Sequence, residues 1–253
     1  MVVGAIIQAR MGSTRLPGKI MKPVLGKPLL ALMLERVKLA RSLDVVVMAI
    51  PDTAENDQLA ALCEQCGALV FRGSENDVLS RYYLAAKKFS IDPVVRLTSD
   101  CPLIDPALVD HAVSLYRKGD YDYLTNAIDR TYPDGQDIEV ISFRALENAY
   151  RNASDTHDRE HVTTYIGVRD KEFRHFSFRY KKDLSKLRWT VDYPRDFDFV
   201  TAVFKELYPS KGASFSMEDI LRLLASKPEI GRINEAVTGK DNLKIAKERQ
   251  KKK

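Results

Sequence analysis

Residues 6–19 read IIQARMGSTRLPGK, and this stretch decides how the rest of the chain is interpreted. The apolar run of residues 2–7 that leads into it predicts a buried β-strand, whereas the segment that follows has no hydrophobic period and predicts a loop. The glycines of this loop allow sharp turns, and its consecutive amides can bind an anion. Guanidinium forks and a point-like ammonium add donors for phosphate oxygens; these cations are Arg10, Arg15 and Lys19. The loop therefore predicts a triphosphate site, and a solvated basic turn is the alternative.

Two common phosphate motifs do not occur in this stretch, which contains neither G-x-x-x-x-G-K-[ST] nor G-x-G-x-x-G. Residues 9–19 fit the pattern A-R-x-x-S-T-R-L-P-G-K, which resembles the signature loop of the sugar-activating cytidylyltransferases. These include the 3-deoxy-manno-octulosonate and acylneuraminate enzymes, and the spore-coat polysaccharide biosynthesis branch is the most similar. The resemblance implies that the loop cradles the CTP phosphates and that Arg10, Arg15 and Lys19 act in catalysis. The nucleotide-binding residues that it implies in this loop are Ala9, Arg10, Gly12, Ser13, Arg15 and Lys19.

The bulk composition predicts one α/β domain with a charged tail. Of the 253 residues, 45% are apolar and 30% are charged, as is usual for a globular domain. The net charge of +5 lies entirely in residues 240–253, which hold seven Lys/Arg and two Asp/Glu and leave 33 of each sign elsewhere. We therefore expect a single domain over residues 1–239, a disordered basic tail and no nucleic-acid partner.

Targeting and redox features favour the cytoplasm. No stretch of the sequence has the length of a membrane span, and the N-terminus lacks the charged-then-apolar order of a signal peptide. The three cysteines are an odd number in a chain of this length, which favours a reducing compartment. The sequence thus predicts a cytoplasmic protein without a membrane partner.

Apolar runs alternate with helical patterns in the first part of the chain. Strands are predicted near residues 2, 45, 69 and 94, and helices over residues 29–41, over residues 78–89 and after a Thr53 cap. This alternation is typical of βαβ units, so we expect an α/β fold with a Rossmann-like, mainly parallel mixed sheet flanked by helices. The resemblance specifies the nucleotide-diphospho-sugar transferase type. Ligands of such sheets bind beyond the carboxyl ends of the strands, where the cationic loop is expected.

Two aspartates are candidate metal ligands. Asp100 follows the fourth predicted strand in the run TSDCPLID, and Mg²⁺ is held by one or two carboxylates together with substrate phosphates; a turn aspartate is the alternative. The resemblance favours the metal, because the family carries its first metal aspartate in an Asp-x-Pro step at this point. Asp192, at the end of a strand predicted over residues 187–192, matches the family's second metal ligand. Asp105 is expected to cap the next helix, and Asp196 to lie in the first turn of a later one.

Short alternating runs between residues 121 and 180 predict a small antiparallel insert or an extension of the sheet. The resemblance implies that this region covers the sugar pocket and forms the contact of a homodimer, which would also cover an exposed sheet edge. Its polar residues either bind sugar hydroxyls or form a polar hairpin; they are Gln136, Asp137 and Glu139.

Further substrate contacts follow from looser matches. The spore-coat branch carries a similar Arg-Glu-His-Val-Thr run, so Arg159 and His161 are expected to bind an acidic substrate. Purely structural roles for these two side chains are the alternative. Arg72, Asp77 and Arg81, after the third predicted strand, are expected to line the nucleotide pocket.

These features together predict a Mg²⁺-dependent nucleotidyltransferase. A hydroxyl of a sugar or sugar acid attacks the α-phosphorus of a nucleoside triphosphate, and pyrophosphate leaves. The resemblance implies that the nucleotide is CTP and that the product is a CMP-sugar for cell-surface polysaccharide biosynthesis. A metal-dependent glycosyltransferase is one alternative, although Asp100-Cys101-Pro102 lacks the second acid of the usual Asp-x-Asp step. A non-catalytic nucleotide-sugar-binding protein is another, although the chain retains both candidate metal carboxylates. The sequence does not identify the acceptor sugar or the residues that contact the base.

Overall fold

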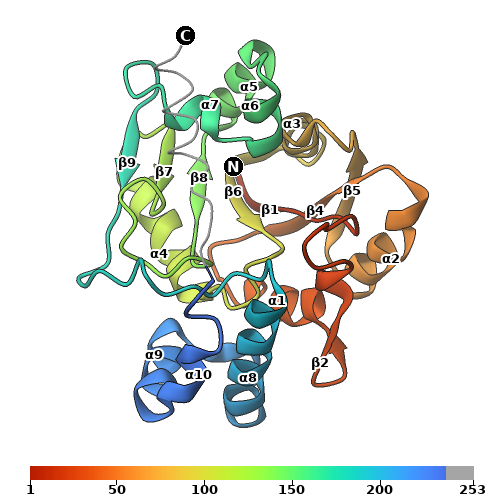
Figure 1. Ribbon diagram of the computed structural model, residues 1–253. Coiled ribbons are helices and arrows are strands. Elements are labelled where there is room, and N and C mark those ends of the chain that lie inside the picture. The colour runs from red at the N-terminus through yellow and green to blue at the C-terminus, as the bar shows by residue number, and fades with distance from the viewer. Residues whose placement is uncertain (238–253) are drawn as a thin grey trace.

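A seven-stranded mixed sheet forms the centre of the protein. The computed structural model describes residues 1–237, so the tail expected over residues 240–253 lies outside the described residues. The strands lie in the order β5-β4-β1-β6-β8-β7-β9 (Figure 1). In chain order they are β1 (Val2–Gln8), β4 (Val45–Pro51), β5 (Leu69–Gly73), β6 (Ile91–Thr98), β7 (Tyr123–Thr125), β8 (Glu139–Ile141) and β9 (His175–Ser177). The predicted mainly parallel mixed sheet is confirmed, and a separate antiparallel pair is formed by β2 (Pro23–Val24) and β3 (Lys27–Pro28).

The strand directions divide the sheet into two halves. β5, β4, β1 and β6 run parallel, whereas β8 is antiparallel to β6 and β7 is antiparallel to β8. β9 then pairs with β7 in parallel. The region of residues 121–180 is therefore an extension of the main sheet and not a separate antiparallel insert. Because β8 is reversed, its first residue, Glu139, lies at the edge where β6 ends, opposite Arg96.

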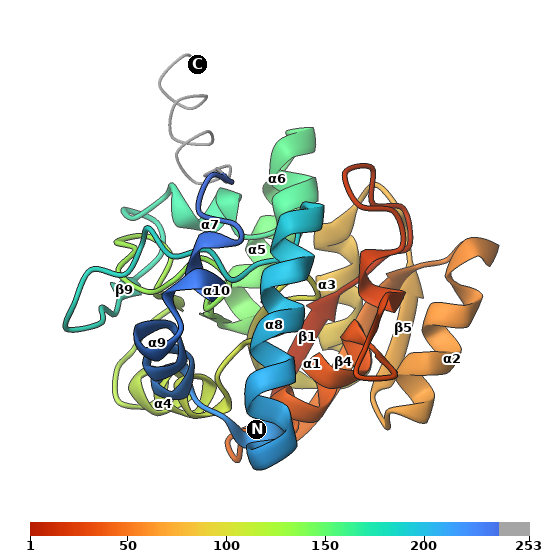
Figure 2. The same ribbon diagram turned by 60° about the horizontal axis from the view of Figure 1, so that its bottom comes forward.

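Helices cover both faces of the sheet. One face packs against α3 (Val78–Lys88), α5 (Phe143–Asn152) and α7 (Thr164–Gly167). The other face packs against α1 (Leu29–Val37), α2 (Asp57–Gln65), α4 (Pro106–Arg117), α8 (Pro194–Lys211), α9 (Met217–Ser226) and α10 (Pro228–Arg232). Figure 2 shows α8, α9 and α10 in front of the sheet on this second face. None of the helices within residues 1–237 is long and apolar enough to cross a membrane.

The parallel strands are buried on both faces, which explains why their sequences are continuous apolar runs. In β1, Ala5 and Ile7 pack into the cluster under α1 and α8, whereas Ile6 packs into the cluster under α3. All three side chains are fully buried. The apolar run ends with β1, so the cations that begin at Arg10 leave the sheet at its carboxyl edge.

Two predicted helix starts are confirmed and a third differs. Asp105 caps α4 by accepting a hydrogen bond from a backbone amide of the first turn, and Asp196 lies in the first turn of α8. Thr53 makes no capping hydrogen bond. A 3₁₀ turn, Ala54–Asn56, precedes α2 instead, and the Thr53 hydroxyl accepts a hydrogen bond from the side chain of Asn56 at 2.7 Å.

Residues 187–192 do not form the predicted strand. The structure gives them an isolated bridge between Asp134 and Arg188. Their backbone groups are bound by loops and side chains: Trp189 N donates to Asp134 O at 2.6 Å, and Asn234 Nδ2 donates to Arg188 O at 2.9 Å. These partners satisfy the backbone of the segment, so it needs no neighbouring strand.

Gly135 lies in the turn before β8, where the chain touches this same segment. Its φ is +105°, and a Cβ there would lie 2.7 Å from both Thr190 N and Trp189 C. A side chain at Gly135 would therefore conflict with the backbone conformation and with a second backbone segment that cannot move aside by rotating a side chain.

We predict that Gly135→Ala lowers the free energy of unfolding by more than Gly26→Ala does. Gly26 is the matched control, because its φ is +77° but no atom lies within 4 Å of a Cβ placed there. Gly26→Ala should cost only the roughly 1–2 kcal/mol of a left-handed residue, whereas Gly135→Ala adds roughly 1–3 kcal/mol of overpacking. Chemical denaturation of both variants measures the difference, and equal losses would contradict the predicted clash.

Candidate active site

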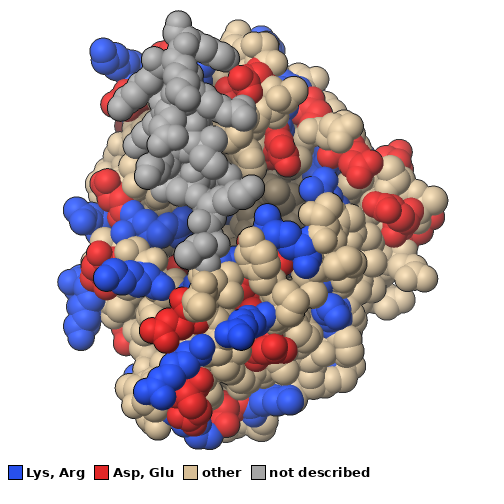
Figure 3. Space-filling view, viewed as in Figure 1, with Lys and Arg blue, Asp and Glu red and all other residues tan. Residues whose placement is uncertain are grey.

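A cleft of about 1110 Å³ opens where β1 and β6 end. Its walls come from the cationic loop, the segment before α3, the turns after β6 and β7, the segment of residues 188–193, and α6 (Thr156–His161). Figure 3 shows this face of the molecule hollowed near its middle, with basic and acidic side chains intermixed around it. The volume is sufficient for a nucleotide together with a second small substrate.

Lys19 lies between two carboxylates. Its Nζ donates to Asp192 Oδ1 at 3.1 Å and to Val191 O at 2.6 Å, and it lies 3.4 Å from Asp100 Oδ2. Arg15 Nη2 lies 2.7 Å from the same Asp192 oxygen. The end of the cationic loop is thereby joined to aspartates that follow it by 81 and 173 residues.

The two cations keep Asp192 ionised. Burial by itself raises the pKa of a carboxyl group, but the charges and hydrogen bonds of Lys19 and Arg15 outweigh it and lower the pKa of Asp192 to about 2. The side chain is therefore a carboxylate throughout the physiological pH range, as a metal ligand must be.

Asp100 is joined to the segment before Asp192 through its backbone. Its carbonyl oxygen accepts hydrogen bonds from Val191 N at 2.7 Å and from the Thr190 hydroxyl at 3.1 Å. The Cys101 thiol lies 3.6 Å from Asp100 Oδ1 and donates to it. The two candidate metal ligands thus lie on backbone segments that are bonded to each other.

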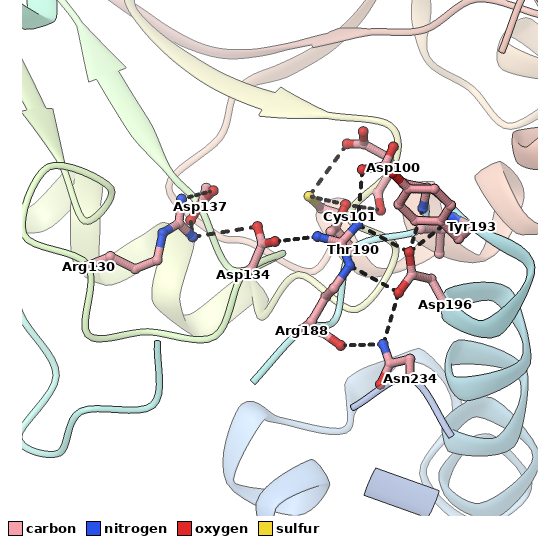
Figure 4. Close-up of polar contacts among 12 residues, drawn as sticks. Asp100, Cys101, Arg130, Asp134, Asp137, Arg188, Thr190, Tyr193, Asp196 and Asn234 are labelled. Atoms are coloured by element: carbon pink, nitrogen blue, oxygen red, sulfur yellow. Dashed lines mark hydrogen bonds and ion pairs between the residues drawn. The ribbon is translucent and has the colours of Figure 1, made fainter. Parts of the chain in front are cut away.

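Arg188 binds three carboxylates, and Figure 4 shows its contacts with Asp134 and Asp196. Its Nη1 donates to Asp134 at 2.8 Å, its Nη2 to Asp192 at 3.0 Å and its Nε to Asp196 at 3.1 Å. Asp196, which is fully buried, also accepts a hydrogen bond from the backbone amide of Asp192. Asn234 donates to both Asp196 and the Arg188 carbonyl. This network fixes the backbone and the carboxylate of Asp192 together.

The donor set at Asp100 and Asp192 fits Mg²⁺. Two carboxylates that already share one cationic nitrogen, with Val191 O beside them, are the oxygen ligands that Mg²⁺ takes, and water and substrate phosphates complete its shell. Within residues 1–237 no group of three or more His, Cys, Asp or Glu side chains could hold a metal ion. A metal ion here would therefore depend on the phosphates of a bound nucleotide as well as on the two aspartates.

Ion pairs also line the wall formed by β6, β7 and β8. Arg96 is paired with Glu139, and the Tyr123 hydroxyl donates to the same carboxylate. Arg130 binds the two oxygens of Asp137 at 2.5 and 2.8 Å. Glu139 and Asp137 therefore lie in the cleft, as expected for substrate contacts, but an arginine already binds each of them.

Arg159 and His161 reach the cleft from α6. The guanidinium of Arg159 binds both oxygens of Asp77 and donates to Tyr150 O at 2.7 Å. Asp77 at the same time caps α3. The ring of His161 lies against that of His157, with centroids 4.4 Å apart. Arg159 thus ties α6 to the start of α3.

Three expected site residues do not line the cleft, and they are Gly12, Arg72 and Gln136. Gln136 is fully buried, and both ends of its amide bind backbone groups of the loop before α4. Arg72 is paired with Asp52 and Asp57. The structure therefore does not bring these three residues into the lining of the cleft. The other expected residues meet in the cleft: Ala9, Arg10, Ser13, Arg15, Lys19, Asp77, Arg81, Asp100, Asp137, Glu139, Arg159, His161 and Asp192.

Arg130, Asp134 and Arg188 line the cleft without having been expected there. Asp134 lies next to Gly135 in a Pro-Asp-Gly run, which indicates a turn and nothing about a ligand. Arg188 lies in a largely apolar run. An arginine in an apolar run of the sequence indicates a buried ion pair, because arginine is almost never fully buried without a partner.

Several known proteins are similar to this chain in sequence and in fold. A family model described as cytidylyltransferase matches residues 4–224. The spore coat polysaccharide biosynthesis protein SpsF of Bacillus subtilis is 32% identical over 242 residues, which cover 91% of this chain and 97% of that protein. A 3-deoxy-manno-octulosonate cytidylyltransferase of Anaeromyxobacter sp. is 37% identical over 120 residues, 46% of this chain and 48% of that protein. The solved structure of a cytidylyltransferase from Leptospira borgpetersenii has a TM-score of 0.87 and 36% identity, covering 91% of this chain and 96% of its own.

Asp134 differs from Asp192 in the direction of its pKa shift. Burial raises the pKa of Asp134 to about 6, and the Asp137 carboxylate adds to the rise against the opposite effects of Arg130 and Arg188. An aspartate of the unfolded chain has a pKa of about 3.9. The folded state therefore binds this proton more tightly than the unfolded state does.

We predict that Asp134 lowers the free energy of unfolding as the pH rises from about 4 to about 6, with no further change above that range. Asp134→Asn should remove this dependence. The variant should therefore gain roughly 2 kcal/mol relative to the wild type between pH 4 and pH 7, after allowance for partial exposure. Denaturation curves of both proteins at several pH values measure the effect. A constant difference between the two proteins across this range would show that Asp134 ionises normally.

Proposed function

This chain belongs to the cytidylyltransferase family, and we propose that it transfers CMP from CTP to a hydroxyl of a sugar or sugar acid and releases pyrophosphate. Family membership makes it a nucleotidyltransferase. The acceptor class is supported by two relatives, one named for spore coat polysaccharide biosynthesis and one for cytidylyl transfer to 3-deoxy-manno-octulosonate. The product would accordingly be a CMP-sugar for a cell-surface polysaccharide.

The contacts of Lys19 with Asp100 and Asp192 are the main observation that supports this proposal. A loop ammonium and two carboxylates converge at the carboxyl edge of parallel strands, where such sheets bind their ligands. Nucleotidyl transfer needs this combination, because the cations hold the triphosphate and the carboxylates hold the metal. A nucleophilic side chain is not required, since the acceptor hydroxyl is itself the nucleophile.

In the proposed reaction the acceptor oxygen bonds to the α-phosphorus while the bond from that phosphorus to the β-bridging oxygen breaks. The hydroxyl proton of the acceptor passes to solvent water, and pyrophosphate leaves with the electron pair of the broken bond. Arg10 and Arg15 are placed on the loop to hold the phosphates in line, and fixed charges of this kind stabilise a transition state without reorganising. Mg²⁺ bound at Asp100 and Asp192 would neutralise charge on the phosphate oxygens.

A homodimer and a cytoplasmic location complete the proposal. β9 is a three-residue end strand, paired on one side with β7, so the backbone groups on its other side can pair with a second copy. Cys63, Cys66 and Cys101 are free thiols, which suits a reducing compartment.

CTP should raise the melting temperature of the protein more than ATP, GTP or UTP does at the same concentration. A ligand that binds only the folded state stabilises it by an amount that grows with its affinity. Thermal-shift measurements with each nucleotide and Mg²⁺ give the comparison. Equal shifts for all four nucleotides would support a phosphate site but remove the preference for cytidine.

Asp100→Asn should reduce turnover about 10²–10³-fold with little change in melting temperature. Asp192→Asn should reduce turnover similarly but also lower the melting temperature, because its carboxylate binds Arg15, Lys19 and Arg188. The double variant should lose much less than the product of the single losses if both side chains serve one metal ion. Pyrophosphate release beside a melting curve separates these effects, and full turnover of Asp100→Asn would refute the mechanism.

Light scattering at micromolar concentration should give about twice the monomer mass of 28.7 kDa if the β9 edge pairs two copies. A monomer mass would contradict the dimer but leave the catalytic proposal untouched.

A further inference from the structure

Arg10 and Arg81 differ from the other cations of the cleft. Neither has an ion-pair partner within residues 1–237, whereas each of the remaining lining Lys and Arg side chains is paired with a carboxylate. Those paired residues are Arg15, Lys19, Arg96, Arg130, Arg159 and Arg188. Arg10 is an exposed residue of the loop, so water can solvate its charge. Arg81 is only 2% exposed, and its missing partner therefore requires an explanation.

The guanidinium of Arg81 uses one of its three nitrogens. Nη1 donates to the carbonyl oxygens of Ser74 and Glu75 and thereby holds the segment before α3. Nε is buried and has no hydrogen-bond partner, and Nη2 makes no hydrogen bond to any described residue. Nε and Nη2 form the side edge of the guanidinium, the pair of parallel donors that binds two oxygens of one phosphate or carboxylate.

Arg36 shows how a purely structural buried arginine is arranged in this protein. It is fully buried, and every nitrogen of its guanidinium donates to a carbonyl: Nε to Ile104 O at 3.1 Å, Nη1 to Ala213 O at 2.7 Å and Nη2 to Leu103 O at 3.3 Å. Its guanidinium also lies 3.8 Å from the centre of the Phe215 ring. Arg36 does not line the cleft, and Arg81 does. Arg36 thus uses all three of its nitrogens, whereas Arg81 leaves Nε and Nη2 unused.

Electrostatics also favour a ligand at Arg81. Burial lowers the pKa of Arg81, and the charge of Arg10 adds to this fall against the opposite effects of Tyr82, Asp77 and Glu75. Asp77, which caps the same helix, has both oxygens bound to Arg159. A buried charge without a partner is costly, and an anion that bound here would remove that cost.

We propose that the Nε/Nη2 edge of Arg81, together with Arg10, binds oxygens of the β- and γ-phosphates and so holds the pyrophosphate leaving group. This inference rests on the proposed transfer reaction. The two arginines carry two charges without protein partners, which matches a polyanion better than a single carboxylate. Arg10 begins the cationic loop, for which a triphosphate is proposed, and Arg81 lines the same cleft. Arg81 would then hold the leaving group during bond cleavage, while Asp100 and Asp192 serve the α-phosphorus end.

The test is equilibrium binding of CTP, CMP and pyrophosphate to the wild type and to Arg81→Met, by calorimetry at one pH and one Mg²⁺ concentration. Arg81→Met should weaken CTP and pyrophosphate about 10- to 100-fold, the value of a lost pair of charge-assisted hydrogen bonds. CMP, which lacks the β- and γ-phosphates, should bind as it does to the wild type. A merely structural role would weaken CMP and CTP equally, so the ratio of the two dissociation constants decides between the roles.

Arg36→Met is the matched control, since it removes a buried arginine remote from the cleft. It should lower the melting temperature and leave the CTP-to-CMP ratio unchanged. If Arg81→Met does not fold, Arg81→Lys provides the same test, because it keeps the charge but lacks the side edge. Equal weakening of CTP and CMP would overturn the inference, as would unchanged CTP and pyrophosphate binding. A wild type that binds pyrophosphate but not CTP would instead refute the proposed function, and the pyrophosphate measurement would still test Arg81.

Discussion

The buried guanidinium of Arg188 is the contact on which the geometry of the cleft depends. It joins a turn beside β8, the segment that carries Asp192 and the first turn of α8. Removing one partner of a buried charge network leaves another charge uncompensated, at a cost of roughly 3–5 kcal/mol. Each of these segments is therefore fixed by the same side chain. The position of the Asp192 carboxylate is therefore set by contacts within the protein, before any ligand is present.

The ion pairs of the other cleft cations fix the positions of these side chains before any substrate arrives. Lys19 is held by Asp100 and Asp192, and Arg130 by Asp137. A side chain already held in place loses little conformational entropy when its ligand binds. The same pairing places a carboxylate beside each of these cations, so the two signs of charge are balanced locally.

The parts of this fold that could be predicted from sequence are those set by local patterns. The continuous apolar runs of β1 and β4 indicate buried parallel strands because such strands have no solvent-facing side. The Asp105 cap and the cationic loop are likewise readable from neighbouring residues. Two features that local patterns do not reveal have a shared physical cause. The Arg188 network and the buried amide of Gln136 join segments far apart in the chain, and no local period or composition encodes such contacts. The same network explains why residues 187–192, apolar enough for a strand, do not form one.

Asn234 contacts Arg188 from 46 residues further along the chain, and this separation affects the order in which the protein can be completed during translation. The cationic loop and the parallel strands β1, β4, β5 and β6 all lie within residues 2–98. They are therefore synthesised before any of the helices α8 to α10. These four strands can therefore assemble while the nascent chain is still growing. The network that holds Asp192 must wait for Asn234 to emerge, so an arrested nascent chain would have the cationic loop without an ordered Asp192 beside it.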